Sequence, residues 1–210
     1  MVILKTIFLI RHSLKEVKYY SDNELVDKQT FDEQKKLNEE GRVLADKLSR
    51  MDIFKNVKEV WSSNYDRAKE TAKYFNENVN VTNSFDERHY GDFPPNITKE
   101  EFWVKQYQDE NFKNVNGESQ KEVRKRFSDQ VNYILENSPN DEIVIVAHNT
   151  AILFYILKYC DLISVDGPKG ITIGYKGKIL IKSSIMKSPS IMKLLFDDNK
   201  ELIDIDYIEV

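Results

Sequence analysis

The chain has 210 residues, of which 40% are hydrophobic and 31% are charged, so it can form one large or two small domains and bury a core. Its 31 lysines and arginines stand against 35 aspartates and glutamates, and the formal net charge of -4 excludes a global basic field for nucleic acid. The single Cys160 excludes an intramolecular disulfide, and we see neither a leader nor an apolar run long enough to span a bilayer, so we expect a cytoplasmic protein with no membrane partner.

The first predicted element is a buried strand. Residues Val2 to Ile10 form an apolar run rich in β-branched residues, which is typical of a strand covered on both faces. The run stops at Arg11 and His12. In an open α/β sheet, ligands bind beyond the carboxyl ends of the strands. Taken alone, however, this pair fits equally well a strand that ends in solvated polar residues.

A loop and a helix are predicted next. Residues 14–32 are polar and show no periodicity, so we expect a loop in which Lys15 either faces a phosphate or is solvated surface. A helix is then predicted to begin at Leu37-Asn38, with Asn38 as its N-cap. Its predicted apolar stripe consists of Val43, Leu44 and Leu48.

A second strand is predicted at residues 57–61, and polar residues follow it as well. Ser63 and Asp66 resemble a capping box, which predicts that a helix begins there. Arg67 lies in the first turn of that helix, where backbone N–H groups and the helix dipole favour an anion. Because Arg67 follows so soon after a strand end, we favour an anion site over an ordinary surface arginine.

The middle of the chain is predicted to leave the sheet. A weak strand at 79–82 is followed by Glu87 to Gly91 and by residues 92–116, which are rich in aromatic and charged side chains and contain Pro94-Pro95. We interpret 92–116 as a helical cap excursion over the carboxyl ends of the strands. Most of its aromatic side chains are expected only to pack it onto the body of the protein.

The second half contains the clearest central strand. A helix capped by Ser119 and Glu122 leads to the apolar run 142–147, which ends at His148. A helix is predicted at about 150–158, and four short runs are predicted to be hairpin strands that complete or flank the sheet. These runs are 171–174, 178–181, 191–196 and 202–208. Together the elements predict a single α/β domain, residues 1–210, with a mostly parallel central sheet and helices on both faces.

Three predicted strands thus lead into candidate reactive residues, namely Arg11 with His12, Arg67, and His148. The chain has three histidines, His12, His89 and His148, and each lies in a segment that already suggests chemistry. Such a concentration is not expected of histidines scattered for packing. A metal site built from them would lack a closely spaced pair of ligands, so we expect none.

The order of these motifs resembles one known family. The matching pieces are Ile10–Ser13, Leu37–Gly41, Ser62–Ala72, Glu87–Gly91, Gly117–Ser119 and Val146–His148. In order and spacing they resemble the histidine phosphatase superfamily, whose founding branch is the cofactor-dependent phosphoglycerate mutases. The resemblance covers residues 3–157 and fades in the tail, and we place the chain by resemblance in the phosphatase branch.

The resemblance implies hydrolysis of a phosphomonoester through a phosphohistidine. His12 would attack phosphorus as the neutral imidazole and form a covalent intermediate. Arg11 and Arg67 would present planar cationic forks to the phosphoryl oxygens, and His148 would add a further donor. Glu87 is the matching candidate for the acid that protonates the leaving oxygen and then activates water. This chemistry requires neither a metal nor another cofactor.

Further residues are candidates for substrate binding. They are Ser13, Lys15, Arg88, Tyr90 and Asn149. Two of them depart from the family pattern, which usually has glycine in place of Ser13 and commonly in place of Asn149. Glycine allows a close backbone approach to a ligand or a positive φ. Either these two side chains donate to the phosphate themselves, or the exchange weakens activity.

Three functions remain open at this stage. A metal-independent phosphomonoesterase leads. A mutase of the same chemistry is favoured by residues 87–91, but the segment after His12 and the lack of an adjacent arginine pair in 99–116 speak against it. A catalytically weak phosphate-binding or regulatory scaffold is the alternative from another class. The expected partner is a small phosphorylated molecule, with no nucleic acid, and a homodimer is left open.

Overall fold

The computed structural model describes residues 4–21, 24–167 and 170–210, so Val2 and Ile3 of the first predicted strand lie outside the described residues. The chain divides into two compact units. The first contains Met1–Asp86, Asn137–His148 and Lys187–Val210, and the second contains Glu87–Glu136 and Asn149–Met186. The expectation of one domain stays a prediction, and each unit is described by itself.

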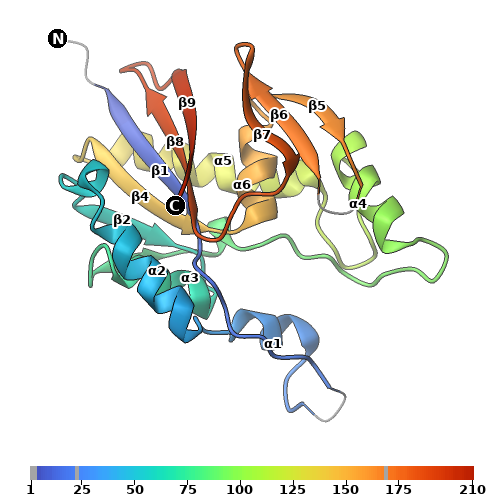
Figure 1. The fold of residues 1–210 in the computed structure, drawn as a ribbon. Helices are drawn as coiled ribbons and strands as arrows, with labels where there is room; N and C mark the ends of the chain where they lie inside the picture. The colour runs from blue at the N-terminus through green and yellow to red at the C-terminus, as the bar shows by residue number, and fades with distance from the viewer. Residues whose placement is uncertain (1–3, 22–23, 168–169) are drawn as a thin grey trace. The chain divides into compact units, whose positions relative to one another are not determined.

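A six-stranded sheet with the order β3-β2-β4-β1-β8-β9 forms the centre of the first unit (Figure 1). Its strands are β1 (Lys5–Arg11), β2 (Glu59–Ser62), β3 (Val79–Val81), β4 (Glu142–Ala147), β8 (Ser190–Phe196) and β9 (Leu202–Glu209). The strands from β3 to β1 pair in parallel, whereas β8 and β9 are antiparallel to their neighbours. The predicted α/β fold with a mostly parallel central sheet is therefore confirmed.

The register of the parallel strands fixes where the chain leaves them. Arg11 of β1 is paired with Ala147 of β4, and the amide of His12 continues the ladder by donating to the Ala147 carbonyl at 3.0 Å. On the other side of β4, the amide of Ser63 donates to the carbonyl of Val146 at 3.0 Å. The residues that directly follow β1, β2 and β4 therefore emerge together at one edge of the sheet.

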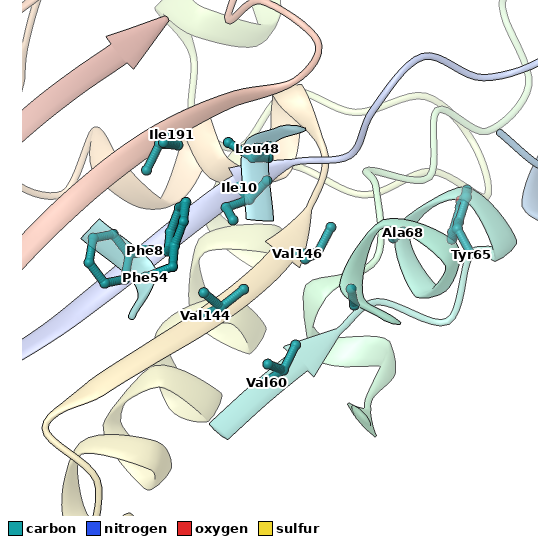
Figure 2. Packing of buried hydrophobic residues seen from close by; sticks show 11 residues of the cluster. Phe8, Ile10, Leu48, Phe54, Val60, Tyr65, Ala68, Val144, Val146 and Ile191 are labelled. Carbon is teal, nitrogen blue, oxygen red and sulfur yellow. The ribbon is translucent and has the colours of Figure 1, made fainter. Parts of the chain in front are cut away.

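One face of this sheet carries the apolar core of the first unit (Figure 2). The core cluster consists of Phe8, Ile10, Leu48, Phe54, Val60, Tyr65, Ala68, Ala72, Val144, Val146 and Ile191. Successive side chains of a strand point to opposite faces, and Ile7 and Ile145 on the other face are buried as well. Burial of each such side chain contributes about 1.5–3 kcal/mol. Both faces therefore hold β1 and β4 in register, as their continuous apolar runs predicted.

Three helices and two 3-10 turns complete the first unit. They are α1 (Lys28–Glu33), α2 (Glu39–Ser49), α3 (Asp66–Lys73), η1 (Asp52–Phe54) and η2 (Asn83–Phe85). Helix α2 begins as predicted, because the side chain of Asn38 accepts from the amide of Gly41 at 2.6 Å. The predicted apolar stripe is wrong at Val43, which is 68% exposed. Leu48 is buried as predicted, and Ala45 is buried in place of Val43.

The prediction of a loop at 14–32 is wrong for residues 28–32, which belong to α1 (Lys28–Glu33). None of the side chains of α1 is buried, so no apolar stripe marks it in the sequence. Its start is fixed by Asp27, whose carboxylate accepts from the amides of Gln29 and Thr30. The helix is therefore held by capping and polar contacts rather than by burial.

The second unit combines helices with an antiparallel sheet. Its elements are α4 (Lys99–Gln108), α5 (Gln120–Asn137, all but its last residue), α6 (Asn149–Ile156), β5 (Asp161–Val165), β6 (Ile171–Tyr175) and β7 (Lys178–Ser184). The capping box of Ser119 and Glu122 is confirmed by both reciprocal hydrogen bonds. The helix expected within 92–116 is α4, and its placement over the strands stays a prediction. No helix in the described part of the chain is both long and apolar enough to cross a bilayer.

Candidate active site

His12 follows β1 directly, and both nitrogens of its ring have partners. The side chain is 6% exposed. Its Nδ1 lies 2.7 Å from the carbonyl oxygen of Ser13, and Nε of Arg67 lies 3.1 Å from its Nε2. A carbonyl only accepts and an arginine only donates, so Nδ1 carries the proton and Nε2 presents its lone pair. His12 is thus held in the tautomer whose Nε2 can act as a nucleophile.

The surroundings of His12 also keep its ring uncharged. Burial and the positive charge of Arg67 hold the pKa of His12 well below its ordinary value, and Arg11 and Lys15 act in the same direction. The hydrogen bond to Ser13 opposes this shift without reversing it. The imidazole is therefore neutral at pH 7.

Arg67 is a buried cation in the first turn of α3, with 2% exposure. Each of its three nitrogens donates a hydrogen bond: Nε to His12, and the two terminal nitrogens to the carbonyl and the carboxylate of Asp32. Its guanidinium carbon also lies 4.5 Å from the centre of the Tyr65 ring, a cation–π contact. Arg67 is therefore fixed in place with its Nε edge toward Nε2 of His12.

His148 follows β4 and stands beside His12, with 5.1 Å between the ring centres. It is buried, and its Nε2 lies 2.6 Å from the hydroxyl of Ser63. The ring of Tyr65 packs against it at 4.6 Å between centres. The structure thus brings Arg11, His12, Arg67 and His148 to one edge of the sheet, although they lie far apart in the chain.

Ser63 does not cap a helix as predicted. The N-cap of α3 is Tyr65, which makes no side-chain capping bond, so the expected capping box of Ser63 and Asp66 is wrong. Because the helix begins only at Asp66, Ser63 precedes it by three positions, and its hydroxyl contacts His148 instead. Ser63 and Tyr65 are site residues that the sequence reading missed. The position of Ser63 directly after β2 was the signal that could have identified Ser63.

Ser13 uses both its amide and its hydroxyl within the scaffold. The amide donates to Oγ1 of Thr71 at 3.0 Å, and the hydroxyl donates to the carbonyl of Gly41 at 2.7 Å. A side chain at position 41 would meet the carbonyl oxygen of Leu14 at 2.0 Å, so this close approach requires glycine. The described residues with positive φ do not include Ser13. Serine therefore fits its backbone conformation and ties the end of β1 to α2.

Replacement of Ser13 by glycine should destabilise the fold. The change leaves the buried carbonyl of Gly41 without this donor, which typically costs about 1–3 kcal/mol. Urea denaturation of Ser13→Gly should therefore give a free energy of unfolding lower by about that amount. An unchanged unfolding midpoint would show that the hydroxyl of Ser13 contributes nothing to stability.

Glu87 lies in the second unit, at the N-terminus of α6. Its carboxylate accepts from the amide of Thr150 at 3.3 Å and from that of Ala151 at 3.0 Å. Helix N-termini leave backbone N–H groups without partners inside the helix, and a carboxylate satisfies them. Tyr90 lies beside the same turn, with its hydroxyl 3.0 Å from that of Thr150. In the chain, α6 begins one residue after His148.

Arg88 and Asn149, two candidates for substrate binding, have partners within the second unit. Arg88 is 1% exposed and donates to Gln106 and to the carbonyls of Glu118 and Phe112. These bonds are those of a structural arginine. The side-chain oxygen of Asn149 accepts from the amide of Met186 at 3.1 Å. Asn149 is likewise absent from the described residues with positive φ, so asparagine serves there without backbone strain.

Lys15 forms an ion pair with Asp32, with 2.9 Å between Nζ and Oδ1. Burial and the charge of Arg67 lower its pKa from the ordinary value of lysine. Within the described ranges, no group of three imidazole, thiol or carboxylate side chains is placed to hold a metal ion. The expectation of a metal-free site stays a prediction.

Comparison with known proteins adds a family and a fold. The model of the histidine phosphatase superfamily (branch 1) matches residues 7–172. No curated protein matches the sequence. A mycobacterial glucosyl-3-phosphoglycerate phosphatase is structurally similar, with a TM-score of 0.63, 18% identity, and coverage of 99% of this chain and 98% of that one. A phosphoserine phosphatase from Entamoeba histolytica is similar with a TM-score of 0.60, 15% identity, and coverage of 96% of each chain.

Proposed function

This chain belongs to the histidine phosphatase superfamily, and we propose that it is a metal-independent phosphomonoester hydrolase that works through a phosphohistidine on His12. The observation that carries the proposal is the state of His12, a neutral ring whose Nε2 lone pair meets the Nε–H of Arg67. A nucleophile of this kind splits one difficult displacement into two easier steps.

In the first step, Nε2 of His12 attacks phosphorus as the bond from phosphorus to the ester oxygen breaks. Negative charge spreads over the phosphoryl oxygens in transit, and fixed donors stabilise it. Arg67 and Arg11 would supply that positive charge, and His148 would donate a further hydrogen bond. The carbonyl of Ser13 stabilises the product, because it holds the Nδ1 proton of an imidazole that gains positive charge on phosphorylation.

Glu87 is proposed as the acid of the first step and the base of the second. It would give its proton to the leaving oxygen, so that the alcohol departs neutral. It would then take a proton from water as that water attacks the phosphohistidine, which releases phosphate and restores His12. The support for this role is the family pattern at 87–91 and the anchoring of the carboxylate at the start of α6.

The substrate is proposed to be a small phosphorylated metabolite. The two similar structures are named as phosphatases of glucosyl-3-phosphoglycerate and of phosphoserine, and both compounds are small phosphomonoesters. These two compounds should be tested first, within a panel of phosphorylated sugars, acids and peptides. Release of inorganic phosphate without a metal ion tests the proposal. Transfer of the phosphoryl group to a second metabolite instead of water would identify a mutase.

The pKa of His12 predicts how phosphoenzyme formation depends on pH. The ordinary value of histidine is 6.5, and that of His12 lies well below it, so the ring stays neutral as the pH falls through 6.5. In the unfolded chain the same ring binds a proton near pH 6.5, so this group should lower the free energy of unfolding as the pH falls through that value. Because the ring of His12 stays neutral down to a pH well below 6.5, the rate of phosphohistidine formation from a saturating aryl phosphate should fall only well below pH 6.5. Rapid-quench experiments across this pH range measure that rate. A half-maximal rate at 6.5 itself would contradict the shift.

A further inference from the structure

Asp32 holds the guanidinium of Arg67 with both its backbone and its side chain. One terminal nitrogen of Arg67 donates to the Asp32 carbonyl at 2.5 Å, and the other donates to its carboxylate at 3.0 Å. The third nitrogen, Nε, is left to face His12. The Tyr65 ring lies against the guanidinium. A single residue of α1 thus fixes the direction in which Arg67 points.

We propose that Asp32 is a positioning residue, which orients Arg67 so that its Nε edge meets the phosphoryl group in transit on His12. This proposal rests on the proposed function. The side chain of a free arginine samples many rotamers. Two bonds to Asp32 remove that freedom before the substrate arrives. A misplacement of about 1 Å at a reacting centre can cost ~10²-fold in rate.

Two lysines offset the negative charge that Asp32 brings to an anion site. Lys15 and Lys35 both contact Oδ1 of Asp32, at 2.9 Å and 3.1 Å, while Arg67 contacts Oδ2. Three cations therefore surround one carboxylate, and the cluster keeps an excess of positive charge. Burial opposes ionisation of Asp32, yet Arg67 and Lys15 hold its pKa below the ordinary value of aspartate. Asp32 therefore remains charged at neutral pH.

The position of Asp32 makes this role testable without unfolding the protein. Helix α1 has no buried side chain, so substitution of Asp32 removes no contact of the apolar core. Glu33 provides a matched control, because it is the adjacent carboxylate of the same helix and accepts from Gln29 rather than from Arg67. Asp32→Asn keeps an oxygen for Arg67 but loses the charge, whereas Asp32→Ala keeps only the backbone carbonyl.

The experiment compares orthovanadate, which resembles the transition state, with inorganic phosphate, which resembles the product. Asp32→Ala should form phosphohistidine about 10–100-fold more slowly than wild type in rapid-quench labelling. It should lose vanadate affinity by a similar factor and phosphate affinity by much less. Asp32→Asn should fall between Asp32→Ala and wild type. Glu33→Gln should match wild type, and circular dichroism should show that every variant is folded at the temperature of the assay, although loss of the partner of buried Arg67 lowers the melting temperature of the Asp32 variants.

Different results would overturn different claims. Tighter phosphate binding and faster labelling in Asp32→Ala would mean that Asp32 competes with the substrate for Arg67, and the positioning role would fall. Equal weakening of vanadate and phosphate would also overturn it, because the effect would then lie in ground-state binding. Wild-type labelling rates in both Asp32 variants would overturn the positioning role of Asp32 but not the proposed function. Absence of phosphohistidine in the wild type would instead overturn the proposed function, and this inference with it.

Discussion

Replacement of His12 by alanine is expected to abolish both turnover and formation of the phosphoenzyme. The variant lacks the Nε2 lone pair that faces Arg67. Removal of a covalent nucleophile lowers kcat by on the order of 10⁶-fold in a well-studied protease, so the residual rate should not exceed the uncatalysed background of the assay. The measurement is labelling with a ³²P-labelled aryl phosphate, quenched with alkaline detergent, in which phosphohistidine is recognised by its stability to base and its loss on later treatment with acid.

The other two histidines provide the controls for this experiment. His148 stands beside His12, but its Nε2 is engaged with the hydroxyl of Ser63 at 2.6 Å, so it should not take over as the nucleophile. The proposed mechanism assigns no step to His89, and His89→Ala should label like the wild type. Labelled phosphate on His12→Ala, located by peptide mapping, would remove the assignment of the nucleophile.

The parts of the fold that the sequence predicted well are those buried on both faces. The strands β1 and β4 show as continuous apolar runs because neither face meets water. Once two such runs each end at a histidine, parallel pairing is enough to place His12 and His148 side by side. The α/β class could therefore be predicted from local patterns, whereas the convergence of the site was predicted from the strand ends together with the family resemblance.

Exposed elements and long-range contacts could not be predicted in the same way. Helix α1 has no buried residue, and β5 is only partly buried, so neither has a periodic apolar face. The hydrogen bond from Arg67 to the carboxylate of Asp32 joins residues 35 positions apart, and the hydrogen bond between Ser63 and His148 joins residues 85 positions apart. Such contacts depend on how the strands are ordered in the sheet, and no local pattern in the sequence encodes them.

The two departures from the family pattern illustrate the same limit. The sequence shows that Ser13 and Asn149 replace glycine, but their partners lie 28 and 37 residues away, at Gly41 and Met186. Both side chains bond to the backbone of their own unit, and neither backbone has positive φ. The doubt that these residues raised about activity therefore loses its physical basis, which favours an active enzyme over a weak scaffold.

Replacement of Glu87 by glutamine should slow the enzyme by an amount that depends on the ester. The amides of Thr150 and Ala151 donate to different oxygens of the Glu87 carboxylate, so glutamine keeps an acceptor for one of them but has no acidic proton to give. An aryl phosphate has a good leaving group, so phosphorylation of His12 should survive the change. An alkyl phosphate needs the proton, and its reaction should slow by ~10²–10⁴-fold.

The same variant should also accumulate the intermediate, because the carboxylate that activates water is lost while the first step on aryl esters continues. Rapid-quench experiments on aryl and alkyl phosphates would therefore show more trapped phosphohistidine than in wild type for the first ester and less for the second. Glu118→Gln is the matched control. The Glu118 carboxylate pairs with Arg126 and accepts from the amide of His89, so its loss should act through structure and slow both esters alike. If Glu87→Gln behaved in that way too, its carboxylate would be a structural cap of α6, and the acid that protonates the leaving group would have to be another residue.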